Sequence, residues 1–186
     1  MGSAPGSLKL VKAGFVVLDA TTSAVQKIIV FQYNPETLVR RLDAAVAPAP
    51  PATAEPREVV SFTVSLDAAD KLERDDPVAK QSGVLPAMAA LESLLYLPAS
   101  SITVWVSGSR RVVPVRITEL VINEQAFDPT LNPIRADVSV SLQVLKDADL
   151  GLNSKGRALW DAHLASLRQL AQLDVGSLAA LGLNGI

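Results

Sequence analysis

Residues 59–66 read VVSFTVSL and alternate apolar with polar side chains along their whole length. One face carries four apolar side chains and the other three hydroxyl groups: Val60, Phe62, Val64 and Leu66 against Ser61, Thr63 and Ser65. A period of two residues is typical of a β-strand with one buried and one solvated face. Residues 136–146 repeat the pattern, with Val138, Val140, Leu142 and Val144 inward and Asp137, Ser139, Ser141 and Gln143 outward. The two stretches predict a protein built on a β-sheet.

Further strands are predicted on both sides of residues 59–66. Residues 8–20 and 25–32 are rich in β-branched side chains and form a hairpin around a short polar link. A third strand is predicted over residues 38–46, a fourth from Ile102 to Val106, and a long one over residues 112–123. The long strand is apolar on both faces, which predicts burial on both, either within the domain or between subunits.

One helix is predicted among these strands. Residues 85–96 carry apolar side chains at helical spacing, namely Leu85, Met88, Leu91, Leu94 and Leu95, and Pro98 closes the segment. The other segments are predicted to be irregular. Residues 67–83 are charged and rich in turn formers, residues 124–133 read as a loop, and residues 47–56 hold four of the twelve prolines.

The pattern changes after residue 150. Ser154 is predicted to cap a helix over residues 155–173, with Trp160, Leu164, Leu167 and Ala171 on one stripe, and a short helical turn follows at residues 175–181. We therefore predict two parts, a β-domain over residues 8–150 and a helical extension over residues 151–186. The expected fold class is α+β, mainly β, with a barrel or sandwich flanked by one helix.

The composition narrows the possible functions. The chain has 186 residues, no cysteine, one histidine and a formal net charge of −2, which disfavours thiolate chemistry, multi-histidine metal sites and a basic nucleic-acid surface. Hydrophobic residues reach 49% and charged residues only 19%. No apolar run is long enough to span a membrane, and residues 1–7 lack the pattern of a secretory signal. Such a chain is expected to assemble in the cytoplasm and to hide apolar surface against partners.

The titratable groups do not form a recognisable catalytic motif. Asp75 and Asp76 precede Pro77 and are interpreted as capping groups at the entry of a helix. His163 stands among aliphatic residues, where a partly buried or interfacial histidine is favoured over a ligand or base. We expect a protein without enzymatic activity, cofactor or metal.

The candidate interface residues are Trp105, Arg110, Arg111, Trp160, Leu164 and Leu167. Trp105 is either an interface anchor or packed beneath the helix, and these alternatives are equally balanced. Trp160 is favoured as a packing residue. The basic pairs Arg40-Arg41 and Arg110-Arg111 favour salt bridges or contacts at the rim of an interface.

Three segments resemble the tube-type proteins of contractile injection systems. Residues 31–36, FQYNPE, resemble the entry motif that follows the N-terminal hairpin of that family. Residues 89–98, AALESLLYLP, are similar to its helix, and residues 114–145 resemble its long hairpin, with linking segments 127–129 and 133–136. The resemblance covers about residues 8–150.

The resemblance implies a tail-tube-like β-barrel that forms a hexameric ring. Such rings stack within a contractile sheath, or join the inner tube to the spike and baseplate of the particle and so take part in protein translocation. Adaptor members carry a LysM module where this chain has a helical tail, so the place in the particle stays open between adaptor, tube protomer and end cap. The tail favours the adaptor, and release of the particle from the cell stays open.

Two further expectations accompany this reading. Polar strand faces such as Thr63 and Ser65, or Ser139, Ser141 and Gln143, are candidates for the lining of a hydrated lumen. The alternative from another class is a small β-barrel that binds or hydrolyses a ligand in its mouth. That alternative requires polar groups that converge on a cavity, whereas the inward faces read as aliphatic.

Overall fold

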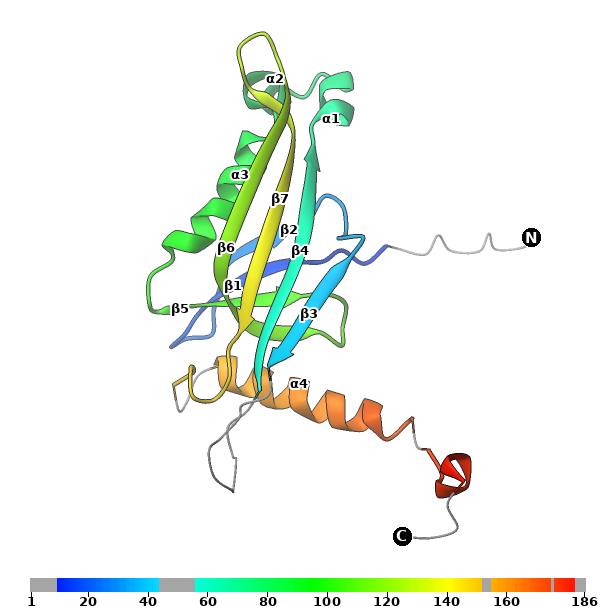
Figure 1. The fold of residues 1–186 in the computed structure, drawn as a ribbon. Coiled ribbons are helices and arrows are strands. Elements are labelled where there is room, and N and C mark those ends of the chain that lie inside the picture. The colour runs from blue at the N-terminus through cyan, green and yellow to red at the C-terminus, as the bar shows by residue number, and fades with distance from the viewer. Residues whose placement is uncertain (1–9, 44–55, 152–154, 175, 183–186) are drawn as a thin grey trace, which may run out of the picture.

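The computed structural model describes residues 10–43, 56–151, 155–174 and 176–182. They form seven β-strands, four α-helices and two short 3-10 helices (Figure 1). In chain order the elements are β1 (Gly14–Asp19), β2 (Val25–Val30), β3 (Leu38–Asp43), β4 (Arg57–Asp67), α1 (Ala69–Glu73), α2 (Pro77–Ser82), α3 (Leu85–Glu92), η1 (Ser93–Tyr96), β5 (Ser101–Val106), β6 (Val112–Phe127), β7 (Pro133–Val144), α4 (Lys155–Ala171) and η2 (Leu178–Leu181). The predictions for residues 1–9, for nearly all of the proline-rich loop and for the Ser154 cap lie outside the described residues.

All seven strands belong to one antiparallel sheet with the order β2-β1-β5-β6-β7-β4-β3. The predicted mainly β, α+β class is confirmed, as is the N-terminal hairpin, which is the β1–β2 pair. The outer strands β2 and β3 do not pair with each other. Within the described residues the sheet is therefore not closed into a barrel by hydrogen bonds.

The sheet bends back on itself along β6. The first four residues of β6 pair with β5, and from Val115 onward the strand pairs with β7, with a bulge between Ile117 and Glu119. We call β6, β7, β4 and β3 the front layer, and β2, β1 and β5 the back layer (Figure 1). A bulge bends its strand and increases the local twist. The bulge lies just beyond the residues of β6 that both layers share.

Aromatic side chains hold the two layers together. The ring of Phe62 on β4 lies 5.6 Å from that of Trp105 on β5, 6.5 Å from Phe15 on β1 and 5.7 Å from Phe31. All four side chains are buried. Burial of one large apolar side chain contributes about 1.5–3 kcal/mol, so this cluster stabilises the contact between the layers.

The alternating strands bury the predicted faces. On β4 and β7 the buried side chains are those of Val60, Phe62, Val64, Leu66, Val138, Val140, Leu142 and Val144. Helix α3 contacts β7 and contributes Met88 and Leu91 to the same core, and Leu94 follows from η1. Leu85 and Leu95, which the sequence placed on the same stripe, are exposed.

Residues 67–83 differ from the prediction of an irregular segment, because they contain α1 and α2. Helices of five and six residues are too short to display a helical period in the sequence. The predicted capping role of the acidic pair is confirmed at Asp76, whose carboxylate accepts a hydrogen bond from the backbone N–H of Ala79 at 2.9 Å. Asp75 lies 2.7 Å from the ammonium group of Lys80 on the surface.

The β6–β7 hairpin is longer than the sequence indicated. Strand β6 continues to Phe127 and β7 begins at Pro133, so the loop predicted over residues 124–133 shrinks to five residues. The Asp128 carboxylate fixes this turn by accepting hydrogen bonds from the backbone N–H groups of Thr130 at 2.8 Å and Asn132 at 2.9 Å. The side-chain amide of Asn132 is the main cause that lowers the pKa of Asp128 to about 2.

Helix α4 packs against β6 below the front layer, as Figure 1 shows. Its Trp160 is 5% exposed and belongs to the main core, and Leu159 packs against a second cluster formed by Leu18, Ile102 and Val104. The helix predicted to begin the extension is therefore in contact with the β-sheet. The two-part division itself stays a prediction.

Candidate functional site

The outward face of the front layer is mainly polar. Three side chains of β4 pair with side chains of β7: Ser61 lies 3.3 Å from Ser141, Thr63 3.3 Å from Ser139, and Ser65 2.8 Å from Asp137. Next to β7, the same face of β6 carries Arg116, Glu119, Val121, Asn123 and Gln125. Next to β4, the same face of β3 carries Val39, Arg41 and Asp43. This face, which we call the polar face, includes the hydroxyl groups that the sequence nominated for a hydrated lumen.

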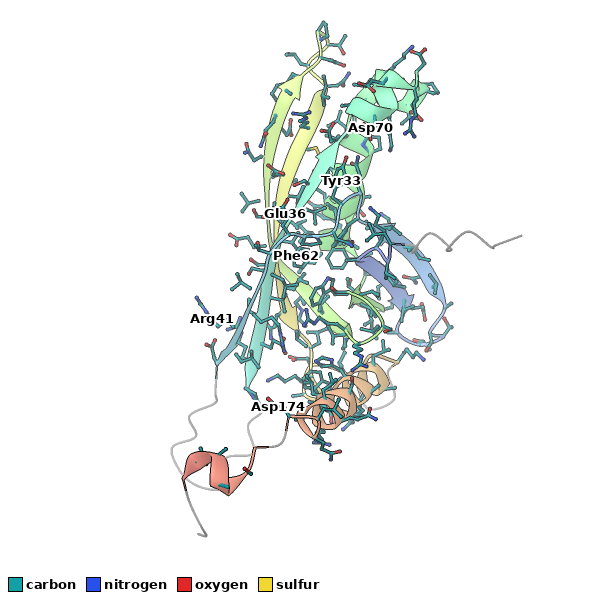
Figure 2. All side chains as sticks on the ribbon, turned by 90° about the vertical axis from the view of Figure 1, so that its right-hand side faces the viewer. Tyr33, Glu36, Arg41, Phe62, Asp70 and Asp174 are labelled. Carbon is teal, nitrogen blue, oxygen red and sulfur yellow. The ribbon has the colours of Figure 1, made fainter. Side chains whose placement is uncertain are left out.

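Strand β3 is one free edge of the front layer. It pairs with β4 on one side only, and no described strand lies on its other side. Val39 is 65% exposed and Leu42 is 54% exposed on this edge. Figure 2 shows Arg41 pointing away from the rest of the molecule. An edge strand with exposed apolar side chains is a template for pairing with another chain.

The outer half of β6 is the second free edge. Strand β5 pairs only with residues 112–115 of β6, so residues 116–127 have β7 on one side and no described strand on the other. Val121 and Phe127 of this part are 54% and 51% exposed. The front layer thus has an unpaired strand on each side, β3 on one and β6 on the other.

Residues 31–36, FQYNPE, hold neighbouring backbone segments in place through their side chains, and we call this segment the clamp. Phe31 is buried in the aromatic cluster, while the Gln32 side-chain amide donates to the backbone carbonyl of Asp67 at 2.7 Å and accepts from its N–H at 3.0 Å. The Asn34 side-chain amide does the same for the segment before β1, because it accepts from the N–H of Ala13 and donates to the carbonyl of Val11, both at 2.9 Å. The side-chain amides of Gln32 and Asn34 therefore take the place of a backbone strand as hydrogen-bond partners where the back layer meets the front layer.

Asn34→Ala is expected to lower the free energy of unfolding by about 1–2 kcal/mol, since it removes two hydrogen bonds to backbone groups. Glu36→Ala in the same turn is the matched control, and a surface substitution there is expected to stay within about 0.5 kcal/mol. Urea unfolding of both variants measures the difference. Equal midpoints would mean that the clamp contributes nothing to stability.

The first group of predicted interface residues clusters around the β5–β6 turn. Trp105 is 1% exposed and stacks on Phe62, so no partner can reach it, and the interface-anchor alternative for this residue is wrong. Because β5 is buried on both faces, alternation alone could not assign its core side. The guanidinium carbon of Arg111 lies 5.7 Å from the Trp105 ring centre, and Arg110 is exposed beside it. These three residues lie together, but only the two arginines are at the surface.

The second group lies on α4. Trp160 is buried in the monomer, which removes it from a surface role and agrees with the packing role favoured for it. Leu164 is half-buried against the main core, and Leu167 is 38% exposed. Of the three candidate interface residues on α4, Leu167 is the one whose side chain is largely accessible.

His163 is buried beside Trp160, with 5.8 Å between the ring centres. Its Nδ1 atom makes no hydrogen bond within the described protein. Burial lowers the pKa of His163 below its usual 6.5; the carboxylate of Glu58 opposes this, and the guanidinium groups of Arg40 and Arg111 add to the lowering. Glu58 is itself buried and lies 2.7 Å from Arg40 Nε.

The pH dependence of stability follows from this lowered pKa. The unfolded chain protonates its histidine near pH 6.5, whereas the folded chain does so only at lower pH, so acid favours unfolding. The contribution of neutral His163 to the free energy of unfolding is therefore fully present above pH 6.5, and it is lost as the pH falls below that value. Thermal unfolding between pH 8 and pH 5 is expected to show a smaller loss of Tm for His163→Gln than for the natural chain. Parallel Tm curves for the two proteins would contradict this account.

No group of three or more histidine, aspartate or glutamate side chains in the described segments has the geometry to hold a metal ion. A cavity of about 510 Å³ lies between η1, β5 and residues 145–151. Arg116 and Asp149 are the ionisable residues among its described lining, and the others include Leu94, Ile102, Val115 and Leu150. A catalytic pocket requires several converging titratable groups, which this cavity does not bring together.

Within the described part of the chain, each helix is too short or too polar to cross a membrane.

The candidate site consists of the polar face and its two free edges. The sequence nominated the hydroxyl groups of the face, but it did not reveal the edges, because an edge depends on which strands pair. No protein-family model matches the chain, and a search of curated proteins finds no similar sequence.

Proposed function

We propose that this chain is a structural, non-enzymatic subunit of a contractile, phage-tail-like injection particle. Copies of the chain form a ring through their front layers, and the ring continues or initiates the inner tube near the baseplate and spike. The observation that carries the proposal is a four-stranded layer with a polar face and a free strand on each side. The resemblance of residues 31–36, 89–98 and 114–145 to tube-type proteins supplies the particle class.

The two edges are different surfaces of the same subunit, so contact between them is head-to-tail. A head-to-tail contact produces a closed ring when its rotation closes. Every copy would contribute β6, β7, β4 and β3 to one continuous wall, and a closed wall has no exposed edges. Six copies, as the resemblance implies, would form the ring.

A lumen is the natural place for the polar face in such a ring. Hydroxyl pairs such as Ser61–Ser141 and Thr63–Ser139 satisfy one another along the two central strands of the face. The buried side of the same layer is already covered by the back layer and α3. A neutral, hydrated wall lets cargo pass without binding it.

The position at the junction of tube and baseplate draws support from the C-terminal segment. Leu173 and Leu181 are 78% and 74% exposed beyond the packed part of α4. The described hydrogen bonds of this segment are local, for example from the Ala180 N–H to Ser177. An adaptor uses such a segment to contact a tube, spike or hub protein, whereas a simple tube protomer or an end cap has less need of it.

Native mass spectrometry with electron microscopy of the purified chain tests the proposal. The expected result is a closed ring of one stoichiometry, with stacked rings at higher concentration. A stable monomer whose melting temperature rises with a small-molecule ligand would instead favour a ligand-binding β-protein and would contradict the ring.

A further inference from the structure

The geometry points to one pairing register between copies, in which β3 of one chain lies antiparallel to the outer half of β6 of the next. In this register Asp43 faces Arg116, Arg41 faces Glu119, and the bulge residue Thr118 is skipped. This inference rests on the proposed ring and adds to it the residues that select the partner. The partner is a second copy of this chain.

The strand directions require an antiparallel contact. Within the front layer β6, β7, β4 and β3 alternate in direction, so β3 runs opposite to β6. A second copy placed beside β6 in the same orientation therefore presents an antiparallel β3. Its polar face then lies on the same side as that of the first copy, and the wall continues without inversion.

The four charges in this register complement each other. Arg41 and Asp43 lie on the polar face of β3, and Arg116 and Glu119 lie on the polar face of β6. All four are exposed, and none has an ion-pair or hydrogen-bond partner among the described side chains. Opposite charges across neighbouring strands stabilise pairing, and like charges destabilise it.

A register without stagger is less favourable. The ladders of the single chain place Arg41, Val59, Gln143 and Arg116 in one row, so a second copy added at the same height would set Arg41 against Arg116. Moving the copy by two residues along β6 instead sets Arg41 against Glu119 and Asp43 against Arg116. Both of these pairs are attractive. A stagger of this kind is what tilted strands in a closed barrel require.

The apolar side chains agree with the same register. On the polar face Val39, 65% exposed, lies opposite Val121, 54% exposed. On the buried side Leu42, 54% exposed, lies opposite Ile117, and Leu38 lies opposite Ile122. The pairing covers the apolar edge residues that the single chain leaves in water.

Charge reversal with rescue tests the register. Arg41→Glu and Glu119→Arg are each expected to raise the concentration at which half of the chains are in rings by at least about tenfold, and the double variant is expected to restore it. Because both residues are exposed and unpaired in the monomer, circular dichroism and Tm should not change. Arg74→Glu, at an exposed position between α1 and α2 and outside the proposed contact, is the matched control and should assemble normally. If a single variant at 41 or 119 fails to fold, Asp43→Arg with Arg116→Asp supplies the same cycle.

The outcomes separate this register from the proposed function. Rings of the natural chain whose assembly ignores the single reversals, or a double variant that is not rescued, would overturn the register and leave the ring standing. A natural chain that stays monomeric at all concentrations would overturn the ring and the register with it.

Discussion

Phe62→Ala is expected to lower the free energy of unfolding by about 3–5 kcal/mol. Phe62 is the one aromatic residue of the front layer that contacts three rings, those of Phe15, Phe31 and Trp105. Its removal leaves a cavity between the layers, which can collapse only if the sheet bends further. Denaturant unfolding measures the loss.

Phe127→Ala is the matched control for this substitution. It removes the same atoms from the front layer, but at a position that is 51% exposed near the tip of the β6–β7 hairpin. We expect a change of less than about 0.5 kcal/mol there. Similar losses for the two variants would mean that the contact between the layers does not depend on the aromatic cluster.

Deletion of residues 151–186 is expected to destabilise the β-domain by at least about 3 kcal/mol, whereas a chain that ends at Ala171 keeps its stability. Removing Trp160 alone empties a buried tryptophan site, and such losses amount to about 3–5 kcal/mol. The segment after Ala171 has exposed leucines at 173 and 181 and makes local hydrogen bonds. Thermal and urea unfolding of the two truncations measure the contrast.

The same truncations locate the adaptor contact. If the chain that ends at Ala171 still forms rings but no longer joins a neighbouring tube or spike protein, the segment after α4 is the docking element. If both truncations unfold at the same temperature as the full chain, neither α4 nor its buried Trp160 stabilises the core.

The alternating strands were the most predictable part of the fold. Residues 59–66 and 136–146 each have one buried and one solvated face, so the period of two is visible in the sequence. The helix predicted over residues 85–96 corresponds to α3 and the 3-10 helix η1, because Met88, Leu91 and Leu94 are spaced for one face. These features depend only on neighbours along the chain.

Other features depend on residues that are distant in sequence. Trp105 could not be assigned because β5 packs the second cluster on its Val104 side and the aromatic cluster on the other. The outer half of β6 was read as apolar on both faces, but its Val121 is exposed because the bulge between Ile117 and Glu119 turns it to the outward face beside Ser139. The amide groups of Gln32 and Asn34 gave no local signal of their role, since their partners are backbone atoms of other segments.

The candidate site, too, has features that depend on neighbours along the chain and features that depend on distant residues. The hydroxyl groups of the polar face could be named from the strand pattern, and the structure brings Thr63 and Ser139 within 3.3 Å of each other. The edge residues Arg41 and Glu119 could not be related to each other, because 78 positions separate them and their contact would lie between chains. The periodicity of one chain's sequence therefore cannot predict a contact between two chains.

A disulfide between copies tests the central claim most directly. The chain has no cysteine, so Val39→Cys combined with Val121→Cys introduces a single candidate pair. Within one chain these positions are three strand spacings apart, about 14 Å, which is too far for a disulfide. Under mild oxidation we expect a ladder of covalent multimers that ends at one ring size and collapses on reduction, while each single variant stops at a dimer. A double variant that remains monomeric under the same oxidation would contradict the claim that copies join through β3 and β6.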